Sequence, residues 1–70
     1  MHACEFQNIS TGESFGYAEL PDRHAAEGYA LTVLVKLGEN PDDVRQAATM
    51  AGPTWEDIRA DGYGIRIYEK

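Results

Sequence analysis

The chain has 70 residues, of which 43% are apolar, and a formal net charge of −6 from twelve Asp and Glu against six Lys and Arg. So short a chain forms one domain, residues 1–70, and leaves little volume for a large buried substrate cavity. The negative charge disfavours direct contact with nucleic acid, because binding to phosphates is driven by Lys and Arg that release counter-ions.

Two alternating segments flank a turn in the first twenty residues. Ala3–Asn8 and Ser14–Leu20 have the alternation of strands, and Gly12 between them can supply the positive φ of a short connection. The sequence therefore predicts a β-hairpin. We expect Cys4 and Phe6 to share one face of the first strand, and Phe15 and Tyr17 to share one face of the second.

The segment between Asp22 and Gly38 carries two competing patterns. Residues 26, 29, 30, 33 and 37 form one helical face, whereas residues 29, 31, 33, 35 and 37 alternate as a strand would, and Gly28 weakens a helix interior. We favour a helix, because Asp22 can cap its start and because Lys36 and Gly38 are typical of a last turn and a helix end.

The residues from Gly38 to Ala51 give the firmest helix prediction in the chain. Asn40 is a capping residue, Pro41 suits the first helical position, and two aspartates follow where unpaired backbone N–H groups attract negative charge. We expect a helix from Pro41 to Ala51. Its buried stripe consists of Val44, Ala47, Ala48 and Ala51.

The stretch GPTWEDIRADGYG, residues 52–64, has two interpretations. Thr54 and Asp57 resemble a capping box, so a short helix would place Trp55 and Ile58 on one inward face and end near Gly62. The alternative is a second hairpin that turns at Asp61-Gly62 and pairs Ile58 with Ile65 and Asp57 with Arg66. We favour the helix and keep the hairpin as the alternative.

The last residues, YGIRIYEK, predict a strand with Ile65 and Ile67 inward and Arg66 and Tyr68 on the opposite face. This strand and the first hairpin can form one antiparallel sheet covered by two or three helices. The predicted fold is thus a small α+β two-layer sandwich. A sheet of this kind has two edges, and an exposed edge can accept a strand from a partner or from a second copy.

Groups suited to catalysis are few. A cysteine nucleophile would be Cys4 with His2 or His24 as base, yet Cys4 lies beside Phe6 in a predicted strand, where a buried, unreactive thiol is usual. His2, Cys4 and His24 also lack the paired spacing of zinc sites, and the sequence has no phosphate-binding glycine loop. We therefore expect no enzymatic activity, no cofactor and no metal.

The compartment is inferred from cysteine use and hydropathy. A single cysteine excludes an intrachain disulfide framework and fits a reducing compartment, so we expect a cytoplasmic protein. No apolar run reaches the length of a membrane span, and the first residues do not resemble a secretion leader. We expect neither membrane insertion nor secretion.

Acidic and aromatic residues are the candidate binding groups. Carboxylates on a small rigid body can occupy a groove of Lys and Arg that is built for nucleic acid, and exposed Trp and Tyr are enriched at interfaces. Trp55 itself favours the core, with an exposed anchor as the alternative. We expect partner contacts at Glu5, Glu13, Glu19, Asp42, Asp43, Trp55, Glu56, Asp57, Asp61 and Tyr68.

These features favour an acidic protein-interaction module whose partner is a basic protein complex that handles nucleic acid. In size, acidity and α+β build the chain resembles small phage-encoded inhibitors, including the anti-CRISPR proteins, although this likeness is one of composition and includes no shared motif. An inhibitor or regulator that mimics nucleic acid is what the likeness implies. The alternative is a small structural or regulatory subunit that self-associates, for example as a homodimer, with its charge serving solubility.

Overall fold

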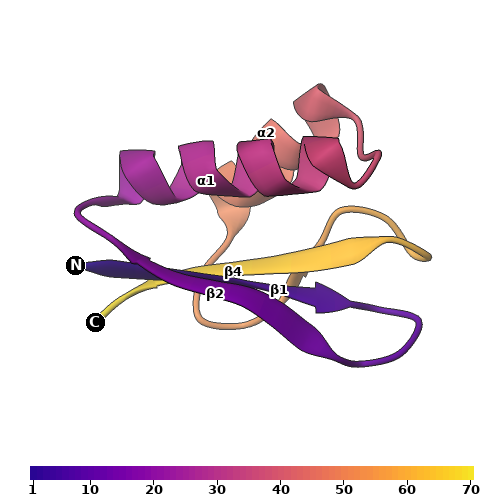
Figure 1. The fold of residues 1–70 in the computed structure, drawn as a ribbon, viewed down its shortest axis with the longest axis horizontal. Coiled ribbons are helices and arrows are strands. Elements are labelled where there is room, and N and C mark those ends of the chain that lie inside the picture. Colours follow the sequence, from indigo (N-terminus) through magenta and orange to yellow (C-terminus); the bar gives the residue numbers. More distant parts are fainter.

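The computed structural model describes residues 1–70 and shows an α+β sandwich of two layers (Figure 1). Its elements follow one another along the chain as β1 (His2–Asn8), β2 (Ser14–Leu20), α1 (Arg23–Lys36), α2 (Pro41–Met50), β3 (Glu56–Asp57) and β4 (Tyr63–Glu69). The strands form one antiparallel sheet in the order β2-β1-β4-β3. Both helices lie on the same face of this sheet, so the other face is open (Figure 1). The predicted fold class is confirmed, with four strands instead of three.

Helix α1 confirms the helical interpretation of the ambiguous segment. Asp22 caps it, accepting a hydrogen bond from the backbone N–H of Ala25 at 2.8 Å. The helix stops at Lys36, and Gly38 adopts the left-handed conformation. Leu37, which the helical pattern aligned with residues 26, 29, 30 and 33, lies past the last helical residue and is 47% exposed, while Leu34 is fully buried.

Helix α2 begins as predicted and ends at Met50, one residue before the predicted end. The Asn40 side chain accepts from the backbone N–H of Asp42 at 2.9 Å and of Asp43 at 3.3 Å. The guanidinium of Arg23 donates to the carbonyl oxygens of Ala48 and Ala51 at 2.8 and 2.7 Å. A side chain at the start of α1 therefore satisfies backbone acceptors at the end of α2 and joins the two helices.

A bulge in β2 corrects one expectation about the first hairpin. Cys4 pairs with Ala18 and Phe6 with Phe15, so two residues of β2, Gly16 and Tyr17, lie opposite the single residue between Cys4 and Phe6. The extra residue reverses the alternation. Phe15 therefore packs toward the core while Tyr17 points to the open face, and the two do not share a face.

The predicted third helix is wrong, and the alternative hairpin is present with a different register. β3 pairs with β4 through Glu56 opposite Ile65 and Asp57 opposite Gly64, a shift of two residues from the pairing we expected. The shift arises because the turn spans Arg59 to Gly62, closed by a hydrogen bond from the Gly62 N–H to the Arg59 carbonyl at 3.2 Å. A turn of this length moves the partner of each β3 residue toward the start of β4.

The core lies between the sheet and the helices. Cys4, Phe6, Ile65 and Ile67 contribute from the strands, and Ala26, Ala30, Leu34, Val44, Ala47, Ala48 and Ala51 from the helical side. The ring of Phe6 lies 5.6 Å from the rings of both Phe15 and Tyr29. The buried stripe predicted for α2 and the inward orientation of Ile65 and Ile67 are confirmed.

Candidate protein-binding site

Ion pairs compensate five of the twelve carboxylates, and three of the remaining seven lie together at one edge of the sheet. Five ion pairs join Arg23 to Glu27, Arg45 to Asp42, Arg59 to Glu39, Arg66 to Glu5 and Lys70 to Glu19. Seven carboxylates have no such partner: Glu13, Asp22, Asp43, Glu56, Asp57, Asp61 and Glu69. Lys36 is the one Lys or Arg outside these pairs, so seven unpaired negative charges and one unpaired positive charge give the net charge of −6.

Glu5 belongs to a compensated cluster on the open face of the sheet. Arg66 lies opposite it on β4 and donates to its Oε1 through Nε at 3.1 Å and through Nη2. The guanidinium carbon of Arg66 also lies 4.6 Å from the ring of Trp55 and 5.5 Å from that of Tyr68. Trp55 is half-buried in this cluster and lies outside the core, so its assignment to the core is wrong.

Glu19 is compensated by the last residue of the chain. The Lys70 ammonium donates to the Glu19 carboxylate at 2.9 Å and to the Tyr17 hydroxyl at 2.8 Å, and the hydroxyl itself donates to Glu19 at 2.8 Å. The hydrogen bonds from Lys70 and Tyr17 lower the pKa of Glu19, and the same contacts raise the pKa of Lys70. Two of the three carboxylates of the first hairpin, Glu5 and Glu19, are thus neutralised by Arg66 and Lys70 near the end of the chain.

Three predicted contact residues converge on a groove between α2 and the edge strand β3. Asp43, Glu56 and Asp57 line it together with Gln46, Ala47, Met50 and Ile58, and the groove encloses ≈ 310 Å³. The four residues from α2 recur at helical spacing, which places them along one side of the helix. No Lys or Arg lines the groove, and Met50 is 63% exposed. The result is an apolar floor with a negative rim.

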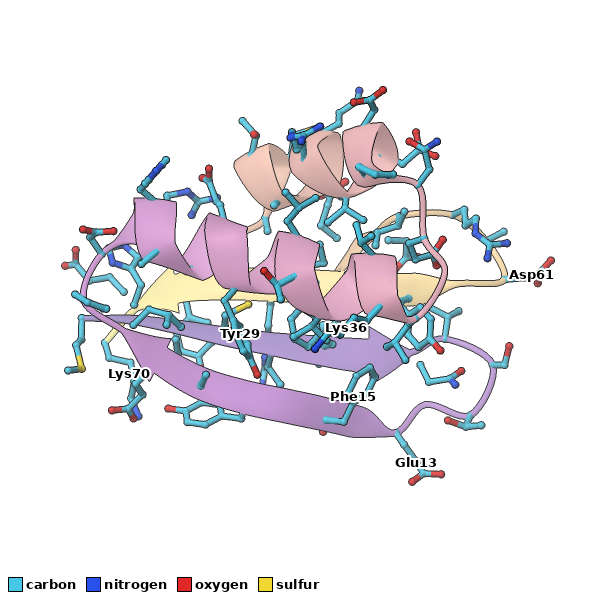
Figure 2. The ribbon with its side chains drawn as sticks, turned by 45° about the horizontal axis from the view of Figure 1, so that its top comes forward. Glu13, Phe15, Tyr29, Lys36, Asp61 and Lys70 are labelled. Atoms are coloured by element: carbon cyan, nitrogen blue, oxygen red, sulfur yellow. The ribbon has the colours of Figure 1, made fainter.

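The remaining predicted acids lie elsewhere. Asp42 is exposed and paired with Arg45 at 3.1 Å. Asp61 and Glu13 project from the turns of the two hairpins at the same end of the molecule, opposite Lys70 (Figure 2). Glu13 also borders a second hollow of ≈ 270 Å³ between the first hairpin and the end of α1.

A buried carboxylate that sequence reasoning missed lies behind the second turn. Glu39 has a side chain only 3% exposed, and its Oε1 accepts from Arg59 at 2.9 Å while Oε2 has no partner. This hydrogen bond and the negative charge of Glu39 raise the pKa of Arg59. An alanine methyl at Gly62 would stand 2.5 Å from Oε2. The glycine just before β4 was a usable signal, since it marks a place where another group approaches the backbone.

The groups considered for catalysis lie apart from this groove. Cys4 is buried in β1, and burial raises the pKa of its thiol to about 12, which keeps it protonated at neutral pH. No three His, Cys, Asp or Glu side chains are arranged to hold a metal ion. Neither helix has the length and apolar character that crossing a membrane requires.

Comparison of the chain with protein-family models, with curated proteins and with solved structures found no match in any of the three.

Proposed function

We propose that this protein is a non-enzymatic interaction module that binds a basic protein partner at the groove between α2 and β3. The partner we favour belongs to a nucleic-acid-handling complex, and the protein would act on it as a small inhibitor or regulator. Phage-encoded inhibitors of this kind, the anti-CRISPR proteins among them, are the class that its size, acidity and α+β build resemble. A single cysteine, Cys4, that forms no disulfide fits a reducing compartment such as the cytoplasm.

The observation that carries the proposal is the location of the uncompensated charge. Asp43, Glu56 and Asp57 surround the groove without an ion-pair partner, and Asp61 follows in the adjoining turn. Charges of one sign around a groove attract an oppositely charged partner over several ångströms and accelerate its association. A surface that binds nucleic acid carries clustered Lys and Arg and is therefore the natural complement of this edge.

The test is affinity capture from lysate of the native host, with the bound proteins identified by mass spectrometry. The wild-type protein is compared with Asp43→Asn/Glu56→Gln and with a matched control, Glu13→Gln/Glu69→Gln, which also removes two unpaired carboxylates. We expect a basic partner that the control retains, that the groove variant loses and that high salt releases. Equal capture by the two variants, or capture that ignores salt, would overturn the proposal.

A second candidate function is self-association through the open face of the sheet. On this face Arg66 and Lys70 balance Glu5 and Glu19, so two copies could approach with less repulsion than elsewhere. Tyr17, 45% exposed, offers apolar area there. Light scattering separates the candidates: a stable dimer that Tyr17→Glu dissociates supports self-association, whereas a monomer at every concentration excludes it.

A further inference from the structure

We infer that the groove binds an extended, basic segment of the partner, which adds to the free edge of β3 as a fifth strand beneath α2. This inference rests on the proposed function and specifies its binding mode. Three features carry it: the unpaired backbone of the edge, the shape of the groove and the distribution of charge and apolar surface along it.

The backbone of β3 offers hydrogen-bonding groups to a new neighbour. The Ile58 N–H donates to the Tyr63 carbonyl at 2.9 Å, and Asp57 is the next residue back along the strand. Because residues of an antiparallel strand point their N–H and C=O groups alternately to one side and the other, those of Asp57 point away from β4. An arriving strand can therefore exchange two hydrogen bonds with Asp57.

The opposite edge of the sheet is less suited to this role. β2 is longer, but its bulge at Gly16 and Tyr17 interrupts the regular spacing of backbone groups and bends the strand. The edge of β3 is not covered by a helix, because a groove of ≈ 310 Å³ lies between β3 and α2. Of the two edges, β3 has the unbulged backbone and the adjoining groove.

The groove accommodates the alternating side chains of a strand. A residue that pairs with Asp57 shares its face of the sheet, so its side chain points to the open side, and its two neighbours point toward α2. On the α2 side they meet Ala47, Met50 and Ile58. The exposed, flexible Met50 can adjust to apolar side chains of different shape. The geometry therefore favours an apolar residue on each side of the residue that pairs with Asp57.

The carboxylates at this edge favour a basic residue opposite Asp57. A Lys or Arg opposite Asp57 forms a cross-strand ion pair on the open side, while Glu56 and Asp43 add negative charge on the α2 side that attracts a basic segment without direct pairing. A second copy of this chain is a poor occupant, since its own edge would bring the same carboxylates into the contact. Because the edge provides only two backbone hydrogen bonds, electrostatic attraction contributes much of the affinity. We therefore expect the affinity to fall as the salt concentration rises.

The experiment uses the whole 70-residue protein and a capped peptide of four lysines alternating with three valines. In the predicted register the lysines pair with Asp57, so N-methylation of the lysine amides removes the donor, while N-methylation of the valine amides leaves it intact. We expect the lysine-methylated peptide to bind roughly tenfold more weakly, as the loss of a backbone hydrogen bond implies, and the valine-methylated peptide to bind like the parent. Fluorescence of the single tryptophan, Trp55, next to β3, gives the affinity.

Nuclear magnetic resonance locates the peptide. Slowed hydrogen exchange at the Asp57 amide, with Asp61 as the matched exposed control, supports strand addition. Equal binding of the two methylated peptides, shifts confined to the open sheet face, or no binding of the parent peptide would each overturn it. These outcomes do not contradict the proposed function if capture of the partner from lysate still requires Asp43 and Glu56. The converse result, peptide binding without such capture, would overturn the proposed function alone.

Discussion

Replacing Gly16 with alanine tests whether the bulge of β2 is held by a close contact with the core. Gly16 has a φ of +70°, and a methyl group there would stand 2.6 Å from Cδ2 of Phe6. Phe6 has no room to withdraw, since it is fully buried with Phe15 and Tyr29 at 5.6 Å from its ring. The substitution therefore carries two costs, one in the backbone and one in packing.

The two costs have different sizes and can be added. A residue with a side chain in the left-handed region loses about 1–2 kcal/mol, and overfilling a packed core costs about 1–3 kcal/mol. Gly16→Ala is thus expected to lower the free energy of unfolding by about 2–5 kcal/mol. A chain of 70 residues has a total of about 4–10 kcal/mol on the usual per-residue scale, so the loss is a large fraction of the total and the variant should be severely weakened.

Gly12→Ala is the matched control, measured by urea unfolding alongside Gly16→Ala. Gly12 has a similar φ of +77° but no neighbour within 4 Å of the added methyl, so only the backbone cost of about 1–2 kcal/mol applies. In a Phe6→Leu background the packing cost at Gly16 should shrink, because the shorter side chain leaves space. If Gly16→Ala costs no more than Gly12→Ala, or if Phe6→Leu does not relieve it, the contact does not limit this position.

Three further predictions concern stability. Arg66→Met should lower the free energy of unfolding by about 2–3 kcal/mol in chemical denaturation, because it leaves the mostly buried Glu5 unpaired, whereas Arg45→Met breaks only an exposed pair and should stay within about 0.5 kcal/mol. Arg23→Lys should cost about 1–3 kcal/mol, since the guanidinium bonds Glu27 through Nε and the Ala48 and Ala51 carbonyls through Nη2, and the single nitrogen of an ammonium cannot occupy both places; equal stability would contradict this. Cys4 should resist alkylation until the protein unfolds. Because burial raises the pKa of its thiol from 9.0 to about 12, the stability it contributes is complete below pH 9 and is lost as the pH rises toward 12, a decline that Cys4→Ala should reduce in unfolding curves.

The parts of the fold that were predicted correctly are those fixed by local chemistry. The caps at Asp22 and Asn40 and the glycine after α1 identify helix ends from a few neighbouring residues. The alternation of Ile65, Arg66, Ile67 and Tyr68 likewise fixes both faces of β4, because one residue step reverses the side chain. In each case the decisive interactions lie within about four positions along the chain.

The predictions that were wrong concern segments whose structure depends on contacts with residues far away in the sequence. Residues 54–58 satisfy the local pattern of a helix, but Glu56 and Asp57 instead form a strand that pairs with β4, and Trp55 lies against Arg66. The bulge in β2 brings Gly16 close to Phe6 across the sheet; a glycine inside a strand is typical of a bulge, but where the extra residue falls depends on the pairing with β1. Propensity yields to tertiary contacts in such short elements.

The candidate site was predicted residue by residue but not as an arrangement. Net charge and acidic positions are properties of the sequence, whereas compensation depends on which strands become neighbours. Pairing of β1 with β4 places Arg66 beside Glu5, and the chain end places Lys70 beside Glu19, which removes both acids from the uncompensated set. A helix at residues 54–58 predicts no groove here, because one of the two walls of the groove is the strand β3.

The two edges of the sheet are protected from pairing with a second copy in different ways. The edge of β2 is bent by its bulge, and the edge of β3 is short and bordered by three carboxylates. Bringing two β3 edges together would place both sets of carboxylates in one contact, where repulsion opposes the few hydrogen bonds gained. If a partner strand adds to β3 as inferred above, the carboxylates at this edge repel any acidic strand. A basic strand meets no such repulsion and is favoured. Selectivity at this edge therefore comes as much from the strands that the charge excludes, including its own, as from those that it attracts.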